Sequence, residues 1–454
     1  MKFSRNLNMT SGNPTKLLFT FAIPMLIGNL FQQAYSLADS IVVGHFVGAN
    51  ALAAVGATSS TTFLFFSVCS GIGSGSSVVT SQYFGAGDAR KTKSAIANSA
   101  YLMFAAALIM GLAAYIAAPS VLRLLETPEE ILPDAVAYIR ISCLGVPLVA
   151  VYNYASSMLR ALGDSRTPLF FLIIASVLNI VLDVVLVYCF HMGVVGVALA
   201  TVIAQLVSGA SCLMYAFRYN PYFLLSKEDW QPDRKMMAHA LKLGLPMAMQ
   251  WSMIAVSTSV LQRFVNSFGP AAMAAYTATC RIDQLLQQPY GSVNAALATY
   301  TGQNYGARRM DRVKDGLRHG MMMCAVFTLV MMIAMQLFGN QIISIFVREE
   351  EVIRIGGTAL RITSWFYIFL ALIYMCRGVL NGVGDALFSF INGVVEVACR
   401  ILLPVWLVTI PTMGMWAIWW TTAATWTISG LTCLVRYMHW RHKAGKKAEA
   451  ADET

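Results

Sequence analysis

The sequence predicts an all-α membrane protein with about twelve transmembrane helices in two lobes of six helices each. Three observations predict this fold class: the composition, the length of the apolar segments, and a repeat that relates the two halves of the chain. Of the 454 residues, 57% are hydrophobic and 12% are charged, which is about half of the charge that soluble domains carry. The mean hydropathy is +0.62. This charge is too low to cover the surface of a soluble protein of this length, so a soluble enzyme is excluded.

Apolar segments follow one another along the whole chain. A helix needs about 20 apolar residues to cross a bilayer, and about twelve segments reach that length. The first segment is too long for the core of a secretory signal, so we expect it to stay as a helix. The approximate spans are 17–43, 51–80, 95–117, 133–156, 168–190, 193–216, 238–262, 272–300, 319–338, 353–376, 387–409 and 413–437.

Basic residues are concentrated in alternate loops. One set of loops, together with both termini, holds most of the Lys and Arg residues, and we assign Arg377 to one of these loops. The opposite set holds only Arg123, Arg263, Arg348 and Arg354. Because Lys and Arg accumulate in cytoplasmic loops, we predict a multi-pass protein of the cell (inner) membrane with both termini in the cytoplasm. This topology explains the net charge of +10 without a nucleic-acid partner.

The two halves of the chain repeat each other at an offset of 221 residues. Matching residues include Gly48 and Gly269, Gln82 and Gln303, Gly163-Asp164 and Gly384-Asp385, Thr201 and Thr422, and Ser208-Gly209 and Ser429-Gly430. Each half contains six predicted helices, an even number, so both halves enter the membrane in the same direction. Such parallel repeats form two bundles that rock around a central site.

The repeat also predicts the domain organisation. We expect an N-terminal lobe over 1–217, a cytoplasmic linker over 218–237, a C-terminal lobe over 238–440 and a cytoplasmic tail over 441–454. The linker is polar and contains Pro221 and Pro232.

Polar side chains inside the predicted spans are candidates for function, because a bilayer makes them costly. In the first half these are Asp39, Asn179, Asp183 and Thr201. Asn179 and Asp183 are four residues apart and share one helix face. Asp183 and Thr201 lie at similar depths on neighbouring helices, roughly 10 Å and 12 Å from one membrane boundary at 1.5 Å per residue. Oxygen atoms placed in this way could hold a small hard cation or share a proton.

The second half does not repeat these acids. At the offset of 221, the residues that match Asp39, Asn179 and Asp183 are Val260, Arg400 and Pro404. The candidate ion site is therefore confined to the first half.

The second half has its own charged residues within helices: Arg281, Asp283, Glu396 and Arg400. Glu396 and Arg400 are four residues apart and can pair, whereas Arg281 and Asp283 need partners elsewhere. All four are either structural or part of a substrate-binding surface. In the first helix Pro24 removes a backbone hydrogen bond, which predicts a kink, either a static one or a hinge.

Motifs of enzymes and of metal or phosphate binding are missing from the sequence. It contains no GxxxxGK[ST] loop and no HExxH, so neither ATP hydrolysis nor a zinc-dependent reaction is expected. The nine cysteines lie in or beside apolar stretches without a CxxC pair and are interpreted as small buried apolar residues. The glycine-rich segment 71–75 lies within an apolar helix, where close helix packing explains it best. We predict no cofactor.

Four segments carry a resemblance to a known family. They are Ile23-Pro24-Met25 through Ala38-Asp39-Ser40, Ser81-Gln82-Tyr83-Phe84-Gly85-Ala86-Gly87-Asp88, Arg281-Ile282-Asp283-Gln284 and Gly302-Gln303-Asn304-Tyr305-Gly306-Ala307. In this order and within a twelve-helix frame, they resemble the multidrug and toxic compound extrusion (MATE) transporters. Within that family the chain is similar to the prokaryotic branch named for a DNA-damage-inducible protein. The resemblance implies a V-shaped arrangement of the two lobes.

The resemblance also implies a function and its residues. It implies a secondary antiporter that exports organic cations or other amphipathic compounds in exchange for H⁺ or Na⁺ by alternating access. The cation site of the branch corresponds here to Asp39, Asn179, Asp183 and Thr201, with Tyr138 in the same network. Gln32, Tyr35 and Asn153 match polar residues that line the cavity of the first lobe. The sequence does not choose between H⁺ and Na⁺.

Two other classes of function fit the sequence less well. A lipid-linked oligosaccharide flippase of the same superfamily would need more basic residues in its cavity to hold a diphosphate, and only Arg281 and Arg400 qualify. A membrane enzyme or a receptor fits less well, because the first needs a catalytic constellation and the second does not need the repeat. We therefore expect small drug-like substrates and membrane lipid as partners, no nucleic acid, and a monomer.

Overall fold

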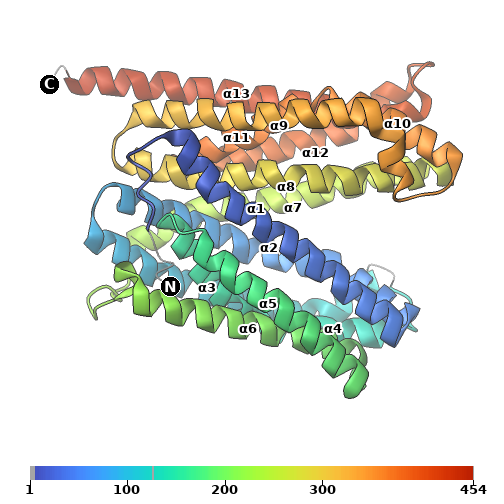
Figure 1. The fold of residues 1–454 in the computed structure, drawn as a ribbon, viewed down its shortest axis with the longest axis horizontal. Coiled ribbons are helices and arrows are strands. Elements are labelled where there is room, and N and C mark those ends of the chain that lie inside the picture. Colours follow the sequence, from blue (N-terminus) through green and yellow to red (C-terminus); the bar gives the residue numbers. More distant parts are fainter. Residues whose placement is uncertain (1–5, 125–126, 453–454) are drawn as a thin grey trace. The chain divides into compact units, whose positions relative to one another are not determined.

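The computed structural model describes residues 6–124 and 127–452, and within these residues it contains helices and no β-strand (Figure 1). The α-helices are α1 (Pro14–Val42), α2 (Ala49–Gly85), α3 (Ala89–Leu124), α4 (Leu132–Ala161), α5 (Arg166–Val184), α6 (Gly193–Tyr219), α7 (Arg234–Asn266), α8 (Pro270–Gly306), α9 (Met310–Ser344), α10 (Glu350–Ser364), α11 (Tyr367–Gly382), α12 (Ala386–Val408) and α13 (Ala417–Asp452). Shorter helical segments are η1 (Val43–Val47), η2 (Val185–Cys189), η3 (Pro221–Phe223) and η4 (Gly414–Trp416).

One predicted span is not a single helix. The apolar run 353–376 is two helices, α10 and α11, which are bent by 53° where they meet. Polar side chains compete with the helical hydrogen bonds at this break. The Ser364 hydroxyl donates to the Arg361 carbonyl at 3.0 Å, and the Gln336 amide donates to the same carbonyl at 2.8 Å. Because these bonds occupy the end of α10, the helix stops although the sequence stays apolar.

The remaining predicted spans each coincide with a helix. By length and composition, seven helices of the described chain can cross a membrane, and the bent pair makes an eighth. Four further helices, α2, α7, α8 and α13, are 33 to 37 residues long, which is also long enough to cross a bilayer. The chain is therefore a multi-pass membrane protein of the expected all-helical class.

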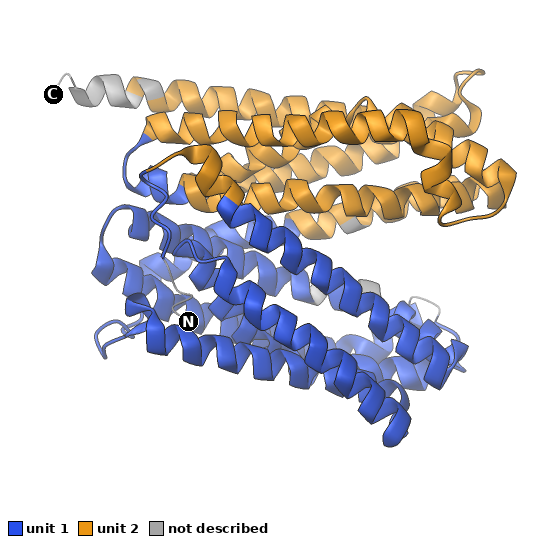
Figure 2. Ribbon diagram, viewed as in Figure 1, with its two compact units in different colours: residues 1–11, 20–249, 302–309 blue, residues 12–19, 250–301, 310–454 orange. Residues whose placement is uncertain are grey.

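The helices belong to two compact units (Figure 2). Unit 1 takes residues up to 11, 20–249 and 302–309, and unit 2 takes 12–19, 250–301 and 310–454. Consequently α1 and α7 each contribute to both units, and the last turn of α8 belongs to unit 1. The lobe and linker boundaries 1–217, 218–237, 238–440 and 441–454 stay predictions.

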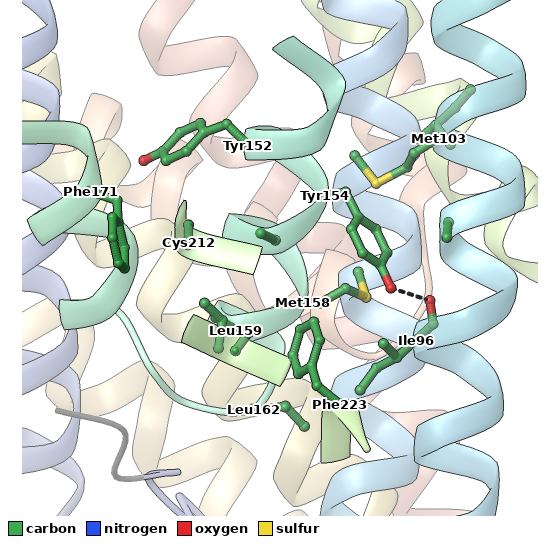
Figure 3. Packing of buried hydrophobic residues seen from close by; sticks show 14 of the residues in the cluster. Ile96, Met103, Tyr152, Tyr154, Met158, Leu159, Leu162, Phe171, Cys212 and Phe223 are labelled. Atoms are coloured by element: carbon green, nitrogen blue, oxygen red, sulfur yellow. Dashed lines mark hydrogen bonds between the residues drawn. The ribbon is translucent and has the colours of Figure 1, made fainter. Parts of the chain in front are cut away.

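The core of unit 1 forms where α2 to α6 face one another (Figure 3). Ile96, Tyr154, Phe171 and Cys212 come from four different helices and are buried together. The Tyr154 hydroxyl donates a 3.0 Å hydrogen bond to the Ile96 carbonyl. The polar end of this aromatic ring is therefore satisfied inside the apolar core, as buried tyrosines require.

The core of unit 2 joins α7, α8, α10 and α13. Val265, Tyr276, Ile355 and Trp419 lie in one buried cluster. The Trp419 indole donates to the Thr279 hydroxyl at 3.2 Å. Each unit therefore has an apolar core of its own.

The glycine-rich segment of α2 packs against α7, which confirms the predicted role of these glycines. A Cβ atom on Gly71 would lie 2.5 Å from the Ala248 Cβ, and one on Gly75 would lie 2.5 Å from the Gly244 nitrogen. Only glycine permits so close a contact between two helices.

The cysteines are all free, and most are buried as predicted. The exceptions are Cys280 and Cys399, which are partly buried, and the exposed Cys189 at the end of η2.

The segment before α1 is fixed by the last turn of α8. The Met9 amide donates to the Gln303 side-chain oxygen at 2.9 Å, and the Asn304 amide donates to the Met9 carbonyl at 3.1 Å. Gln303 also donates to the carbonyl of Ala161 at the end of α4, at 3.1 Å. All these residues belong to unit 1. Hydrogen bonds between side chains and backbone groups therefore hold the segment before α1 and the ends of α4 and α8 together at this end of the unit.

Candidate functional site

Two carboxylates meet between α1 and α5. Asp39 lies near the end of α1 and Asp183 near the end of α5, and their carboxyl groups are within hydrogen-bonding reach of each other. Asp183 has no solvent-exposed surface. One turn before it, the Asn179 amide donates to the Thr201 hydroxyl of α6 at 3.3 Å. The structure thus brings together the four polar residues singled out in the first half.

Several oxygen atoms of this cluster have no hydrogen-bond donor among the described residues. They are Asp39 Oδ1, Asn179 Oδ1, Asp183 Oδ1 and Asp183 Oδ2. Buried polar atoms are nearly always paired, and two buried negative charges repel each other. These oxygen atoms suit a single compensating cation. It is either a proton shared by the carboxyl groups or a small hard metal ion that prefers oxygen ligands.

Tyrosine and glutamine side chains surround the carboxylate pair. Tyr35 of α1 and Tyr138 of α4 both lie within electrostatic range of Asp39 and Asp183. The Tyr35 hydroxyl is within hydrogen-bonding reach of Gln32 and of Gln205. Gln205 was missed by sequence reasoning. Its position four residues after Thr201, on the same face of α6, is the signal that could have identified it.

The two helices that carry the carboxylates, α1 and α5, both end in a π-helical turn, which is a rare form of helix. The π-helical turn η1 begins four residues after Asp39, and η2 begins two residues after Asp183. Such turns are frequently found at functional sites. They widen the helix directly beyond the carboxylate pair, and η1 and η2 contact each other there.

A cavity of about 220 Å³ lies within unit 1, next to this cluster along α1. Its lining includes Gln32 and Asn153, as the resemblance implies, and also Pro24. Tyr35 does not line it and belongs to the carboxylate cluster instead. α1 continues through Pro24 as one helix. The full lining is Pro24, Met25, Gly28, Asn29, Gln32, Ser70, Tyr152, Asn153, Ser156, Arg160, Ser165, Pro168, Leu169 and Leu172.

The predicted pairing of Glu396 with Arg400 is wrong. Glu396 instead forms a 2.5 Å ion pair with Arg377 of α11, and both side chains are buried. The charge pattern of the sequence assigns Arg377 to a loop, and this assignment is wrong. Arg377 lies in α11, where it is buried and paired with Glu396 inside unit 2. Asn392 accepts hydrogen bonds from the same guanidinium, and the Ser429 hydroxyl donates to Asn392 at 3.0 Å.

The other charged residues of unit 2 have different surroundings. Arg400 is buried, and its Nε and one terminal nitrogen have no acceptor among the described residues. Asp283 accepts a long 3.5 Å hydrogen bond from the Tyr367 hydroxyl, and Arg281 is exposed. Asp283 lies within electrostatic range of Arg400. Both interpretations of Arg281, Asp283 and Arg400, structural or substrate-lining, stay open.

Comparison with known proteins identifies the class of protein to which this fold and site belong. The family model MatE matches residues 24–185 and again residues 246–406. The chain is 28% identical over 414 residues to the "Probable multidrug resistance protein YpnP" of Bacillus subtilis, covering 91% of this chain and 90% of that protein. It is 24% identical to the "Multidrug export protein MepA" of Staphylococcus saprophyticus, covering 92% of each.

A solved structure has the same fold. The crystal structure of "MATE in the bent conformation" matches with a TM-score of 0.89 and 23% identity, covering 99% of this chain and all of the other.

The chain is therefore a membrane transporter and not an enzyme. It belongs to the MatE family, and it is a multidrug efflux transporter for small molecules. The two matches begin 222 residues apart, close to the offset of the predicted repeat, which confirms that the halves are related.

Proposed function

We propose that the chain exports organic cations and other amphipathic compounds from the cytoplasm in exchange for H⁺ or Na⁺. The observation that supports this proposal is the carboxylate pair of the partly buried Asp39 and the buried Asp183 in spanning helices, whose buried oxygens Asp39 Oδ1, Asp183 Oδ1 and Asp183 Oδ2 have no hydrogen-bond partner among the described residues. The pair is a binding site for one unit of positive charge, and Asn179, Thr201 and Tyr138 complete its polar surroundings.

The same residues suggest how ion binding moves the protein. An unoccupied pair carries repelling charges, so the bound cation draws α1 and α5 together at their ends. Pro24 weakens the backbone hydrogen bonding of α1 earlier in the helix, and the π-helical turns give both helices a deformable end. Ion binding and substrate binding thereby favour different positions of α1, which is the requirement for alternating access.

The remaining parts of the proposal concern placement and partners. We place the protein in the cell membrane as a monomer with both termini in the cytoplasm, in accord with the basic residues of the loops. The branch named for a DNA-damage-inducible protein stays the predicted subfamily. Transport of a lipid-linked oligosaccharide is the alternative, but no cluster of several basic side chains lines the described cavity.

The test is transport in proteoliposomes with Na⁺ and proton gradients imposed separately. We expect Asp39→Asn and Asp183→Asn to abolish gradient-driven efflux of a cationic dye, because an amide cannot release a proton and binds Na⁺ more weakly. The matched control is Asp283→Asn, which neutralises an acid of unit 2 and should retain coupling. Gel filtration checks that each variant is folded.

The gradient that drives the wild-type protein identifies the coupling ion. Full coupled efflux in both aspartate variants would refute the ion site. Equal loss in Asp283→Asn would show that any intramembrane acid is needed, and that the Asp39–Asp183 pair has no special role.

A further inference from the structure

The part of unit 2 that matches the carboxylate cluster of unit 1 carries a charge of the opposite sign. At the repeat offset, Arg400 of α12 matches Asn179, and Pro404 matches Asp183. Unit 1 therefore has an amide and an acid one turn apart on α5, whereas unit 2 has a guanidinium and an apolar residue at the same positions. A site for a cation in unit 1 corresponds to a fixed positive charge in unit 2.

The guanidinium of Arg400 has unsatisfied donors. Arg400 is only 9% exposed, and its Nε and Nη1 atoms have no acceptor among the described residues. The other buried arginine of α11 and α12, Arg377, is fully provided for, because it pairs with Glu396 at 2.5 Å and donates to Asn392 at 3.0 Å. Glu396 lies one turn before Arg400, but it is occupied by this pair. A buried charge without a partner is costly, and a bound anion would remove that cost.

One face of α8 lies beside this guanidinium. Tyr276, Cys280 and Asp283 are spaced by four and three residues, so they share a helix face, and all three lie within electrostatic range of Arg400. No ion pair joins Asp283 to Arg400 within the described chain. Asp283 instead accepts a 3.5 Å hydrogen bond from Tyr367. The face of α8 therefore leaves the donors of Arg400 unsatisfied.

We propose that unit 2 binds a small monovalent anion of the chloride class between α8 and α12. The guanidinium of Arg400 holds the anion, and the hydroxyl of the buried Tyr276 is a second donor. One negative charge compensates one guanidinium, and the burial of Arg400 limits the ligand to a small ion. This site goes beyond the proposed exchange of substrate against a cation and does not depend on it.

The test follows the melting temperature of the purified full chain in detergent while chloride replaces gluconate at constant Na⁺ and constant pH. Constant Na⁺ keeps the cation site of unit 1 in one state, and gluconate is too large to take the place of chloride. An anion that binds only the folded protein stabilises it, so the melting temperature of the wild-type protein should rise as chloride replaces gluconate. Broadening of the chloride NMR signal by the protein measures binding directly.

Three variants and a control separate the parts of the site. Arg400→Gln should weaken chloride binding at least about tenfold, because charge-assisted hydrogen bonds are lost. Tyr276→Phe should weaken it about threefold, as for one neutral donor. Asp283→Asn should strengthen it at least about twofold, because a negative charge that repels the anion is removed. The matched control is Arg377→Gln, which should lower the melting temperature in both salts and keep its chloride dependence.

Two results would overturn the proposal directly: no effect of chloride on the wild-type protein in either measurement, or an equal effect in Arg400→Gln. Weaker chloride binding in Asp283→Asn would also overturn it, because Asp283 would then be the structural partner of Arg400. If Arg400→Gln does not fold, the NMR signal with the wild-type protein and with Asp283→Asn decides. Since no gradient is used, loss or retention of ion coupling in the aspartate variants of unit 1 does not alter this result.

Discussion

At the scale of single residues, the same sequence motif has two roles in the two halves. Gly163-Asp164 and Gly384-Asp385 match at the repeat offset. Asp164 accepts hydrogen bonds from the Arg166 and Thr167 amides at 3.1 and 3.0 Å, which caps the start of α5. Asp385 instead pairs with Arg436 at 2.7 Å. The repeat conserved the position of the acid, while its partner depends on which helix lies beside it.

The capping role of Asp164 leads to a prediction with a pH dependence. Burial raises the pKa of Asp164 above its usual value, although its hydrogen bonds partly offset this. The folded protein therefore holds this proton more tightly than the unfolded chain. Its contribution to stability falls as the pH rises from the usual aspartate pKa, near 4, through the raised value.

The two variants Asp164→Asn and Asp164→Ala separate the charge from the cap. We expect Asp164→Asn to keep the acceptor and to lose this pH dependence, and Asp164→Ala to lower the stability by about 1–2 kcal/mol at all pH values. Thermal unfolding in detergent between pH 4 and 8 measures both. A pH profile of Asp164→Asn identical to that of the wild-type protein would contradict the prediction.

Residues also mark the limit of what the sequence can predict. The group of Asp39, Asn179, Asp183 and Thr201 is predictable from the sequence because polar side chains inside apolar helices are visible along the chain. The partner of Glu396 is not, because a four-residue spacing shows only which pairs are possible on one helix. Arg377 lies on another helix, and only the packing of α11 against α12 brings it close.

At the scale of elements, the boundaries of helices followed the apolar pattern except where side chains bond to the backbone. The break between α10 and α11 depends on Gln336, a residue of α9. No pattern within 353–376 contains that information. Glycine patterns were more informative, because a run of small residues on an apolar helix has few explanations other than close packing.

The contact between α2 and α7 can be tested with two glycines of the same helix. A Cβ atom on Gly75 would lie 2.5 Å from the backbone of α7, whereas one on Gly56 would meet nothing within 4 Å. We expect Gly75→Ala to destabilise the protein by about 1–3 kcal/mol through overpacking. Gly56→Ala should be neutral or stabilise it by up to about 1 kcal/mol, because alanine favours helix. Melting temperatures in detergent compare them, and equal values would show that α7 can move away without cost.

At the scale of the whole molecule, the repeat has a physical counterpart at the end of unit 1. Added Cβ atoms on Gly85 and on Gly306 would each lie 1.9 Å from a carbonyl oxygen, that of Gln303 and that of Gln82 respectively. These four residues are two repeat-related pairs, so the ends of α2 and α8 cross each other symmetrically. The N-terminal segment then binds to the α8 side of this crossing through Gln303 and Asn304.

If the protein works by alternating access, as we propose, this end of unit 1 has to open, which makes Gln303 the residue to change. Its side chain satisfies the Met9 amide and the Ala161 carbonyl, and leaving a buried group unpaired costs about 1–3 kcal/mol. Gln303→Ala should therefore favour the open state and increase access to the cavity about tenfold.

The readout is the rate at which an impermeant maleimide labels the variant Ser156→Cys in a chain without its native cysteines. The maleimide is applied to inside-out vesicles, so that it reaches the protein from the cytoplasmic side. Gln262→Ala, which removes a partly buried glutamine that donates to Asn266 four residues later on α7, is the control. Labelling that rises equally in both variants, or in neither, would show that these hydrogen bonds do not hold the end closed. Labelling only from the opposite face would reverse the proposed orientation of the chain.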